Sequence, residues 1–398
     1  MKKKARYEGA LWAGALILIL AYLFSMWYCG RDPLAHSNYD SYTRIALAWR
    51  AGNVWLPEDC PWLELAVYEG HYYVSFPSVP ALVLFPLTFL FDLKTPNTLL
   101  IALYLLFTYF AAYGLARRWR GPAFAMCAAL TLTLGSNLFC CAMDGGVWYQ
   151  AQVLSMLLVT LFAYGITSDA PSGWAIGLFC LALSVGCRPF QAVYVPLGLY
   201  LLWKKVSVKG AAGKSLARVI PYLIAPALVA VLLGWYNWYR FGNPLEFGHN
   251  YLPEFTRDPE TPQFALKYIA GNIQNLLRLP HFEDGKMTFD KFNGCAFWLL
   301  NPLFVSGLFA GIRKLIRREL DIADGLTVIA LIAEGLLLCM HKTLGGYQFG
   351  ARYLCDLLPA VLLFSLRGKG KRDPAWEVPV CAFACAVNVY GAVWFWTL

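Results

Sequence analysis

The chain has 398 residues, of which 59% are hydrophobic and only 14% are charged. This composition excludes an ordinary soluble domain, and uncharged runs of about 18–20 residues are long enough to cross a bilayer. The net charge of +9 is divided among short basic clusters between the apolar runs, a pattern typical of cytoplasmic loops rather than of a face that binds nucleic acid. The sequence therefore predicts an all-α polytopic integral membrane protein that has the lipid bilayer as a partner and binds no nucleic acid.

The first apolar run covers residues 10–28 and is longer than the apolar region of a signal peptide, without a small-residue cleavage site. We therefore interpret it as a retained first span that leads to an outer loop at residues 29–97. Within that loop, residues 77–92 are apolar but short and contain three prolines. If this segment crossed the membrane, the basic cluster "ARRWRG" would lie outside, so we expect a re-entrant or surface-lying helix.

The rest of the chain fits a single membrane domain, residues 1–398, that keeps all five basic clusters on the cytoplasmic side. Spans two to seven fall within residues 98–238, a second large outer loop covers 239–294, and C-terminal spans fill 295–398. We expect a plasma-membrane protein with a cytoplasmic N-terminus and its polar chemistry on the outer face, where all five histidines fall. About eleven spans result, at residues 10–28, 98–116, 123–142, 147–167, 172–186, 189–203, 219–238, 295–312, 322–340, 354–366 and 378–397.

The segment "NYDSYTRIALAW", residues 38–49, places one acid at the start of an amphipathic helix soon after the first span. Apolar side chains recur at the spacing of one helical face, and Ser41 can cap the helix N-terminus. Such a helix would lie in the membrane interface with Asp40 near the outer surface. On this segment alone, Asp40 is either a functional carboxylate or an acid that interacts favourably with the helix dipole.

Two further charged residues lie between apolar runs. Asp144 falls in a very short outer turn, where an acid at membrane level tends to be functional, although a solvated turn residue is an equal alternative. Arg188 stands directly before Pro189, which breaks the helix. An arginine this deep meets an anion or a carboxylate partner, or else it extends its charged end to the interface.

Two turn-rich outer segments, residues 234–251 and 341–360, combine aromatic and glycine residues with charged ones. The planar fork of Arg352 is suited to a phosphate at the level of lipid head groups. The alternative is a local ion pair with Asp356, one helical turn later. As candidate substrate-binding residues, these segments supply Arg240, His249, Lys342, Gln348, Arg352 and Tyr353.

Five segments in order resemble the GT-C superfamily of polyprenyl-phosphate-sugar glycosyltransferases, such as protein O-mannosyltransferases, lipid A aminoarabinose transferases and mycobacterial arabinosyltransferases. The resemblance runs from residue 1 to about residue 366, and only the order of its loose motifs is specific. It implies a bundle with a seven-span module, surface helices in a large first outer loop, and a later outer loop. The segments are "NYDSYTRIALAW", "YEGHYYVSFPSVPALVLFPLTFL", "CRPFQAVYVPL", "NWYRFGNPLEFG" and "FGARYLCDLLPAVLL".

The resemblance also implies site residues. The family's catalytic carboxylate maps onto Asp40 and its second acid onto Asp144. Basic residues that would hold the phosphate of a lipid-linked donor are Arg352, Arg240, Arg188 and Lys342. The sequence departs from many relatives at Ser75 and Phe76, where a lysine is common, and it ends on an apolar run where many relatives carry a soluble domain.

The chemistry implied is the transfer of a sugar from a polyprenyl phosphate to an acceptor at the outer face of the membrane, with inversion. Asp40 would take the proton of the acceptor hydroxyl, and Arg352 would stabilise the leaving phosphate. A divalent metal (Mg²⁺, Mn²⁺ or Ca²⁺) held by Asp40 and Asp144 is another source of positive charge. The acceptor (a glycan, a lipid or a protein) is left open. The alternatives are another protein of lipid-linked saccharides, either an O-antigen-type polymerase or ligase or a flippase or transporter.

Overall fold

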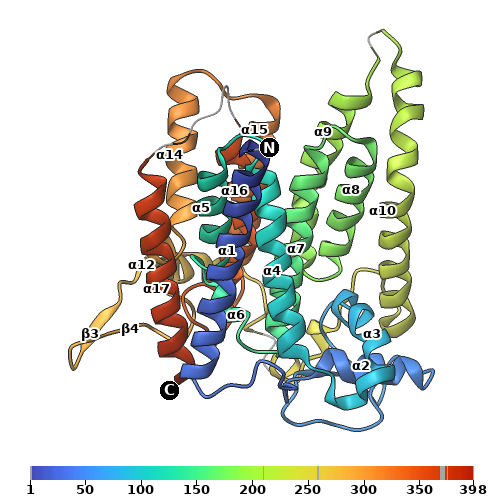
Figure 1. Cartoon of the computed structure of the whole chain (residues 1–398). Coiled ribbons are helices and arrows are strands. Elements are labelled where there is room, and N and C mark those ends of the chain that lie inside the picture. Colours follow the sequence, from blue (N-terminus) through green and yellow to red (C-terminus); the bar gives the residue numbers. More distant parts are fainter. Residues whose placement is uncertain (1, 209, 258–259, 368–372, 374, 398) are drawn as a thin grey trace.

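The computed structural model describes residues 2–208, 210–257, 260–367, 373 and 375–397, with side chains from residue 8 onward. Helices run up and down through the molecule, and two two-stranded sheets are confined to one end of it (Figure 1). Within the described residues, six helices of 18–30 residues are long and apolar enough to cross a membrane: α1, α4, α7, α10, α15 and α17. The expected all-α membrane architecture is thereby confirmed.

The N-terminal half contains the first outer segment and a close-packed group of helices. Its elements are α1 (Lys2–Tyr28), α2 (Ser41–Arg50), β1 (Leu65–Tyr68), β2 (His71–Val74), α3 (Val79–Phe91), η1 (Asp92–Lys94), α4 (Asn97–Ala116), α5 (Pro122–Thr133), α6 (Leu138–Cys141), α7 (Val147–Ile166), α8 (Pro171–Val185), η2 (Pro189–Tyr194) and α9 (Val195–Val206).

The C-terminal half begins with the longest helix and continues through a second irregular segment. Its elements are α10 (Ala212–Phe241), η3 (His249–Tyr251), α11 (Pro253–Thr256), η4 (Leu266–Tyr268), α12 (Ile269–Leu277), β3 (His281–Glu283), β4 (Lys286–Thr288), α13 (Phe297–Leu300), α14 (Pro302–Ile316), α15 (Ile322–Cys339), η5 (Arg352–Leu357), α16 (Leu358–Leu366) and α17 (Glu377–Thr397).

Every segment expected to span contains a helix, but several of these helices are interrupted. The segment 123–142 divides into α5 and α6, and the segments at 189–203 and 354–366 each begin as a 3₁₀ helix before continuing as α9 and α16. Proline stands at the second position of α9 and of α16, where its missing N–H costs no helical hydrogen bond. The shorter helices are below the length that spans a bilayer alone, so the number of eleven spans stays a prediction.

The first outer segment forms a small subdomain at one end of the bundle. Helices α2 and α3 lie across this end, opposite the end at which α1 begins (Figure 1). Strands β1 and β2 pair antiparallel, with Leu65 opposite Val74. Tyr42, Ile45 and Leu84 are fully buried in a separate hydrophobic cluster beneath the hairpin. The amphipathic pattern of residues 41–50 therefore serves to pack α2 against α3 rather than to leave it alone on a surface.

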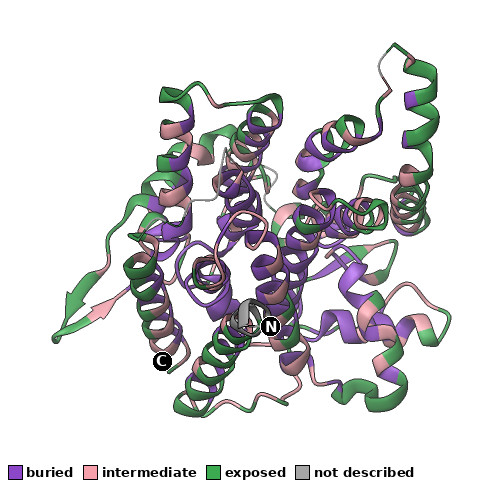
Figure 2. Cartoon of the chain, turned by 45° about the horizontal axis from the view of Figure 1, so that its top comes forward, coloured by how far each residue is buried: buried purple, intermediate pink, exposed green. Residues whose placement is uncertain are grey.

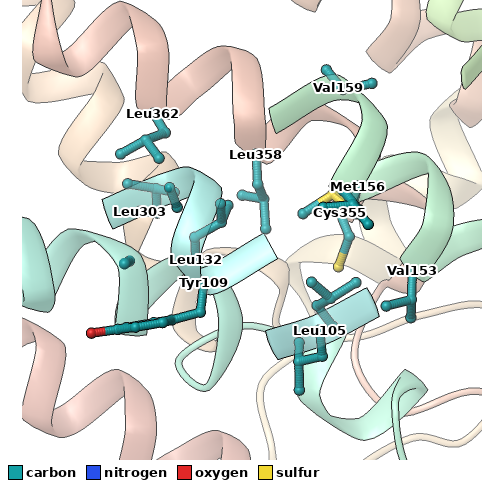
Figure 3. Close-up of a cluster of buried hydrophobic side chains, with 14 of the residues drawn as sticks. Leu105, Tyr109, Leu132, Val153, Met156, Val159, Leu303, Cys355, Leu358 and Leu362 are labelled. Carbon is teal, nitrogen blue, oxygen red and sulfur yellow. The ribbon is translucent and has the colours of Figure 1, made fainter. Parts of the chain in front are cut away.

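The main core joins the centre of the bundle. Leu105 and Tyr109 of α4 pack near Met156 of α7, Leu132 of α5 and Leu358 of α16 (Figure 3). Figure 2 shows these central helices as largely buried, whereas α10 and the β3–β4 hairpin are exposed along most of their length. The central helices thus form the buried core of the molecule.

Candidate functional site

A cavity of about 330 Å³ opens at the end of the bundle that holds α2 and α3. Its walls come from the segment before α3, the start of α7, the segment before η2, the loop after α10, the end of α15 and the start of η5. Most of the lining is aromatic or apolar, as in sites that hold small ligands. The charged residues and histidines that line it are Arg188, Glu246, His249, His341 and Arg352.

Arg352 is 5% exposed and is held in place by its own loop. Its backbone N–H donates to Gln348 Oε1 at 2.8 Å, and its Nη2 donates to the carbonyl of Gly345 at 2.7 Å. Its Nε has no hydrogen-bond partner, and among the described residues no carboxylate pairs with its charge. A buried guanidinium in this state is costly without an anion, so the loop presents a positive charge to the cavity.

The loop that carries Arg352 depends on glycine. Gly345 and Gly346 have φ values of 105° and 65°, which favour glycine strongly. Gly350 also has a positive φ, and a Cβ atom there would lie 2.3 Å from the side chain of Asn137. The glycines noticed in the sequence therefore close the loop tightly enough to bring Gln348 and Gly345 against Arg352.

Arg188 is balanced by a carboxylate from a distant part of the chain. Its Nε donates to Asp356 Oδ2 at 2.8 Å, and Gln152 donates to the other oxygen of Asp356. The sequence alternative that gave Arg352 a local ion pair with Asp356 is therefore wrong: in the described structure, Asp356 pairs with Arg188. Residues 352–357 form a 3₁₀ helix, in which positions i and i+3 are aligned and i and i+4 are not.

Tyr353 lies against both cations. The guanidinium carbon of Arg188 is 4.3 Å from the centroid of its ring, and that of Arg352 is 4.7 Å away. The electron-rich ring face stabilises a guanidinium, so the two arginines line one cavity with an aromatic ring beside them. Because Asp356 neutralises Arg188, the pair retains the charge of one cation.

The two histidines of the cavity are neutral. Loss of hydration lowers the pKa of His249 to about 4 and that of His341 to about 3. Phe76 packs edge-on against His249 at 5.4 Å, and Phe264 packs against His341 at 5.1 Å. These side chains therefore add hydrogen-bonding capacity to the cavity at neutral pH without adding charge.

Asp40 is 2% exposed, precedes α2 and does not line the cavity. Its Oδ1 accepts from Arg44 Nε at 2.8 Å, and its Oδ2 lies 3.1 Å from His36 Nε2. The other ring nitrogen of His36 lies 3.0 Å from the carbonyl of Thr95. Both nitrogens thus face oxygen atoms that can accept hydrogen bonds, and the hydrogen bond to Asp40 raises the pKa of His36. Asp40 makes no side-chain cap to α2.

Asp144 lies in the turn before α7 and has its own partners. Its carboxylate forms an ion pair with Arg31, and its Oδ1 accepts from the Gly146 N–H at 2.7 Å and from Ser37 Oγ at 3.3 Å. Ser37, which donates to Asp144, and Asp40 belong to one short loop. The carboxylates of Asp40 and Asp144 nevertheless pair with different arginines.

A divalent metal does not fit these two acids as they are arranged. Each carboxylate already has an arginine as a partner, and a cation would have to displace both of them. Within the described part of the chain, no three His, Cys, Asp or Glu side chains group as metal ligands.

The remaining candidates from the sequence divide by location. Arg240 is buried and donates to the carbonyl of Val74 at 3.0 Å and to Asn237 at 2.8 Å, so it joins α10 to β2. Lys342 donates to Thr261 at 2.8 Å and does not line the cavity. Gln348 supports Arg352 as described, whereas Arg188, His249, Arg352 and Tyr353 come together at the cavity.

Glu64 is a residue that the sequence did not single out. It accepts from the indole Nε1 of Trp148 at 3.2 Å, and Trp148 lines the cavity. Loss of hydration raises the pKa of Glu64, partly opposed by the Trp148 hydrogen bond and by the charge of Arg352. Tyr39, the neighbour of Asp40, packs on the same tryptophan at 4.9 Å. No local motif surrounds Glu64, and only the folded hairpin brings it to Trp148.

Comparison with solved structures shows the fold. ArnT from Cupriavidus metallidurans bound to undecaprenyl phosphate is 14% identical, with a TM-score of 0.51, over 90% of this chain and 59% of ArnT. The Archaeoglobus fulgidus oligosaccharyltransferase in the apo form is 13% identical, with a TM-score of 0.56, over 100% of this chain and 56% of that protein. The same archaeal protein, AglB, with an inhibitory peptide and a dolichol-phosphate, gives a TM-score of 0.55 at 13% identity, over 99% of this chain and 56% of AglB.

The chain thus spans between half and two thirds of the length of these proteins. No protein-family model matches the sequence, and no curated protein matches it. Both ArnT and the archaeal oligosaccharyltransferase are GT-C superfamily members. The architecture expected from the order of the sequence motifs is therefore confirmed: the chain has a GT-C-like membrane fold.

Proposed function

We propose that the chain is a membrane glycosyltransferase that takes a sugar from a polyprenyl-phosphate donor at the 330 Å³ cavity. The observation that carries the proposal is Arg352, a buried guanidinium that lines the cavity without a carboxylate partner in the described structure. The likeness to proteins solved with undecaprenyl phosphate and with dolichol-phosphate supports the class of donor.

The donor phosphate would lie beside Arg352, with Arg188 and Tyr353 next to it. A lipid phosphate that leaves the anomeric carbon gains negative charge, and a fixed cation stabilises that charge best where water is excluded. Asp356 keeps Arg188 in place and cancels its charge. Arg352 therefore supplies the one net positive charge of the arginine pair, which suits the single negative charge of a phosphodiester.

Two carboxylates are candidates for the base that accepts the proton of the acceptor hydroxyl. By its position in the sequence, Asp40 is the proposed base, and it reaches the acceptor only if it exchanges one of its two present partners, Arg44 or His36. Glu64 is the second candidate, because its carboxylate binds a tryptophan of the cavity wall. Direct displacement by the acceptor hydroxyl would invert the anomeric carbon.

We place this cavity on the outer face of the plasma membrane. The helix ends and loops that carry the described basic clusters lie at the opposite end of the bundle, beside the start of α1 (Figure 1). Under the rule that basic loops stay in the cytoplasm, the cavity faces outward and the lipid head group reaches it from the outer leaflet.

The test is sugar transfer by the full chain in lipid nanodiscs, with a radiolabelled polyprenyl-phosphate monosaccharide as donor. Asp40→Asn and Glu64→Gln are compared with Lys342→Gln, a matched change outside the cavity. We expect transfer or donor hydrolysis by the wild type and by Lys342→Gln, and a loss of about 10²–10⁴ in the variant that lacks the base. Donor that stays intact with every protein sample, including samples supplied with membrane-extract acceptors, would contradict the function.

A further inference from the structure

Glu334 is a buried acid of α15 that does not line the cavity. It is 0% exposed, and α15 is one of the helices that are long and apolar enough to cross a membrane. Its Oε1 accepts from Gln191 Nε2 at 3.1 Å, and its Oε2 accepts from the hydroxyl of Tyr194 at 2.6 Å. No ion pair includes Glu334 among the described residues. An acid in such a place is costly to bury, and its two hydrogen-bond donors are uncharged.

Both donors belong to η2, the 3₁₀ helix that follows Arg188. In a 3₁₀ helix, positions i and i+3 are aligned, so Gln191 and Tyr194 lie on one face and bind the same carboxylate. The two side chains are 0% and 1% exposed. Because the backbone hydrogen bonds of a 3₁₀ helix have poor geometry, a helix of six residues depends on side-chain contacts to keep its place. Glu334 supplies two of these contacts.

The other end of η2 forms part of the cavity wall. Arg188, Pro189 and Phe190 all line the cavity. The backbone N–H of Gln191 donates to the carbonyl of Arg188 at 3.0 Å. The main chain of Arg188 is therefore bound to the residue that Glu334 holds, while its guanidinium is bound to Asp356.

Glu334 lies deeper in the bundle than the cavity. Leu338 is one helical turn nearer to the end of α15, on the same face, and it lines the cavity. Four residues of an α-helix rise about 6 Å. Any effect of Glu334 on a ligand in the cavity must therefore pass through η2.

We propose that Glu334 is a positioning residue of the donor site: it fixes η2 and thereby the place of Arg188 in the cavity wall. A leucine would fill a similar space without burying a charged group, so the two hydrogen bonds to η2 are what the acid adds. This inference rests on the proposed function, in which the donor phosphate lies beside Arg188.

Two measurements on the full chain in lipid nanodiscs test the proposal. Isothermal titration calorimetry gives the Kd of a polyprenyl phosphate without a sugar, and hydrogen–deuterium exchange reports how firmly residues 189–194 are held. The variants are Glu334→Leu, which removes both hydrogen bonds, and Glu334→Gln, which keeps an oxygen for Tyr194. The amide of Glu334→Gln can also donate to Gln191 Oε1, which has no partner at present. Tyr194→Phe removes one of the two bonds and replaces Glu334→Leu if that variant does not fold.

The matched control is Lys314→Met, which removes another buried polar contact from α15. Lys314 is 1% exposed, and its Nζ lies 3.0 Å from Asp324 Oδ1 in the first turn of α15, at the end opposite the cavity. A merely structural role of Glu334 would give the same result as this control. Both variants would then lower the melting temperature, and neither would change the Kd.

We expect Glu334→Leu to raise the Kd about tenfold and to speed exchange in η2, because Gln191 and Tyr194 lose their common partner. Glu334→Gln should stay within about twofold of the wild-type Kd. Lys314→Met should leave both the Kd and the exchange of η2 as in the wild type. In the background Arg188→Met/Asp356→Leu, adding Glu334→Leu should not change the Kd further, since the side chain through which it acts is absent.

Four results would overturn the positioning role. They are a wild-type Kd in Glu334→Leu, an equal rise in Lys314→Met, a tenfold rise that persists in the Arg188→Met/Asp356→Leu background, and unchanged exchange of η2 in Glu334→Leu. A wild type that binds no polyprenyl phosphate would instead contradict the proposed function, and the exchange of η2 would still show whether Glu334 holds that helix.

Discussion

The cavity and the loop before α2 lie at the same end of the bundle, but they balance their charges differently. In the cavity, Arg188 has a carboxylate and Arg352 has none among the described residues. In the loop, Asp40 is paired with Arg44 and lies within hydrogen-bond distance of His36, and Asp144 is paired with Arg31. Arg352 therefore lacks an anionic partner among the described residues, whereas the carboxylates of the loop are paired.

This difference indicates that a ligand binds in the cavity rather than in the loop before α2. An acid at membrane level is conspicuous in a sequence because burying a charge is costly. In the folded chain, ion pairs with Arg44 and Arg31 offset the cost of burying the two acids of the loop. For Arg352, by contrast, no carboxylate among the described residues offsets the cost of burying the charge. The importance of Arg352 therefore depends on the partner that it lacks.

Removal of Asp356 should cause the largest loss of stability. Asp356→Ala leaves Arg188 without its carboxylate, and we expect the free energy of unfolding to fall by about 3 kcal/mol or more. Thermal unfolding in detergent measures this loss. The double variant Arg188→Met/Asp356→Leu should recover most of it, and a double variant as unstable as Asp356→Ala would show that the pair is not the cause.

Replacement of Arg352 should lower the activity of the cavity without lowering the stability of the fold. We expect Arg352→Ala to lower kcat/KM for sugar transfer about 10²–10³-fold, equal to about 3–4 kcal/mol of transition-state stabilisation. Its melting temperature should not fall, because an unpaired buried charge is removed. Arg352→Lys tests whether the planar fork matters in addition to the charge. Activity within a few-fold of the wild type in Arg352→Ala would refute the assignment.

The two ion pairs of the loop should differ in strength. The side chain of Asp40 is 1% exposed and that of Asp144 is 16% exposed. We expect Arg44→Gln to lower the free energy of unfolding by about 2 kcal/mol and Arg31→Gln by about 1 kcal/mol or less. Equal melting temperatures in the two variants would remove the distinction between a fully buried and a partly exposed carboxylate.

The neutral histidines predict a dependence on acid. The pKa of His341 is about 3 in the folded chain and about 6.5 in the unfolded chain, so below pH 6.5 only the unfolded chain gains the proton. Stability should therefore fall by about 1.4 kcal/mol for each pH unit below 6.5, until the folded chain also binds the proton. His341→Gln should lessen the drop in melting temperature between pH 7 and 5.5. An unchanged drop would show that His341 is already charged in the fold.

Most of the fold could be predicted from the sequence. Hydropathy located the long helices. The shortness of the apolar segment 77–92 and the position of the basic clusters predicted a re-entrant or surface-lying element there, and α3 lies beside α2 at the end of the bundle. Of the alternatives left open for Arg188, a carboxylate partner is present, as Asp356. These features depend on local composition and on charged residues that lie between apolar runs, and both can be seen in a sequence.

The site was less predictable because it depends on contacts between distant residues. Helical spacing suggested that Asp356 serves Arg352, but the 3₁₀ geometry of η5 turns it toward Arg188, 168 residues away in the sequence. Glu64 reaches Trp148 only through the β1–β2 hairpin. The partners of Asp40 were likewise invisible, although His36 and Arg44 each lie four residues from it.

The most direct test of the account is an experimental structure of the full chain in a lipid nanodisc with a polyprenyl phosphate bound. The account predicts the phosphate within hydrogen-bond distance of the Arg352 guanidinium, beside Arg188 and Tyr353, with Asp356 still paired to Arg188. A phosphate bound elsewhere on the protein, with the cavity between these residues unchanged, would contradict it.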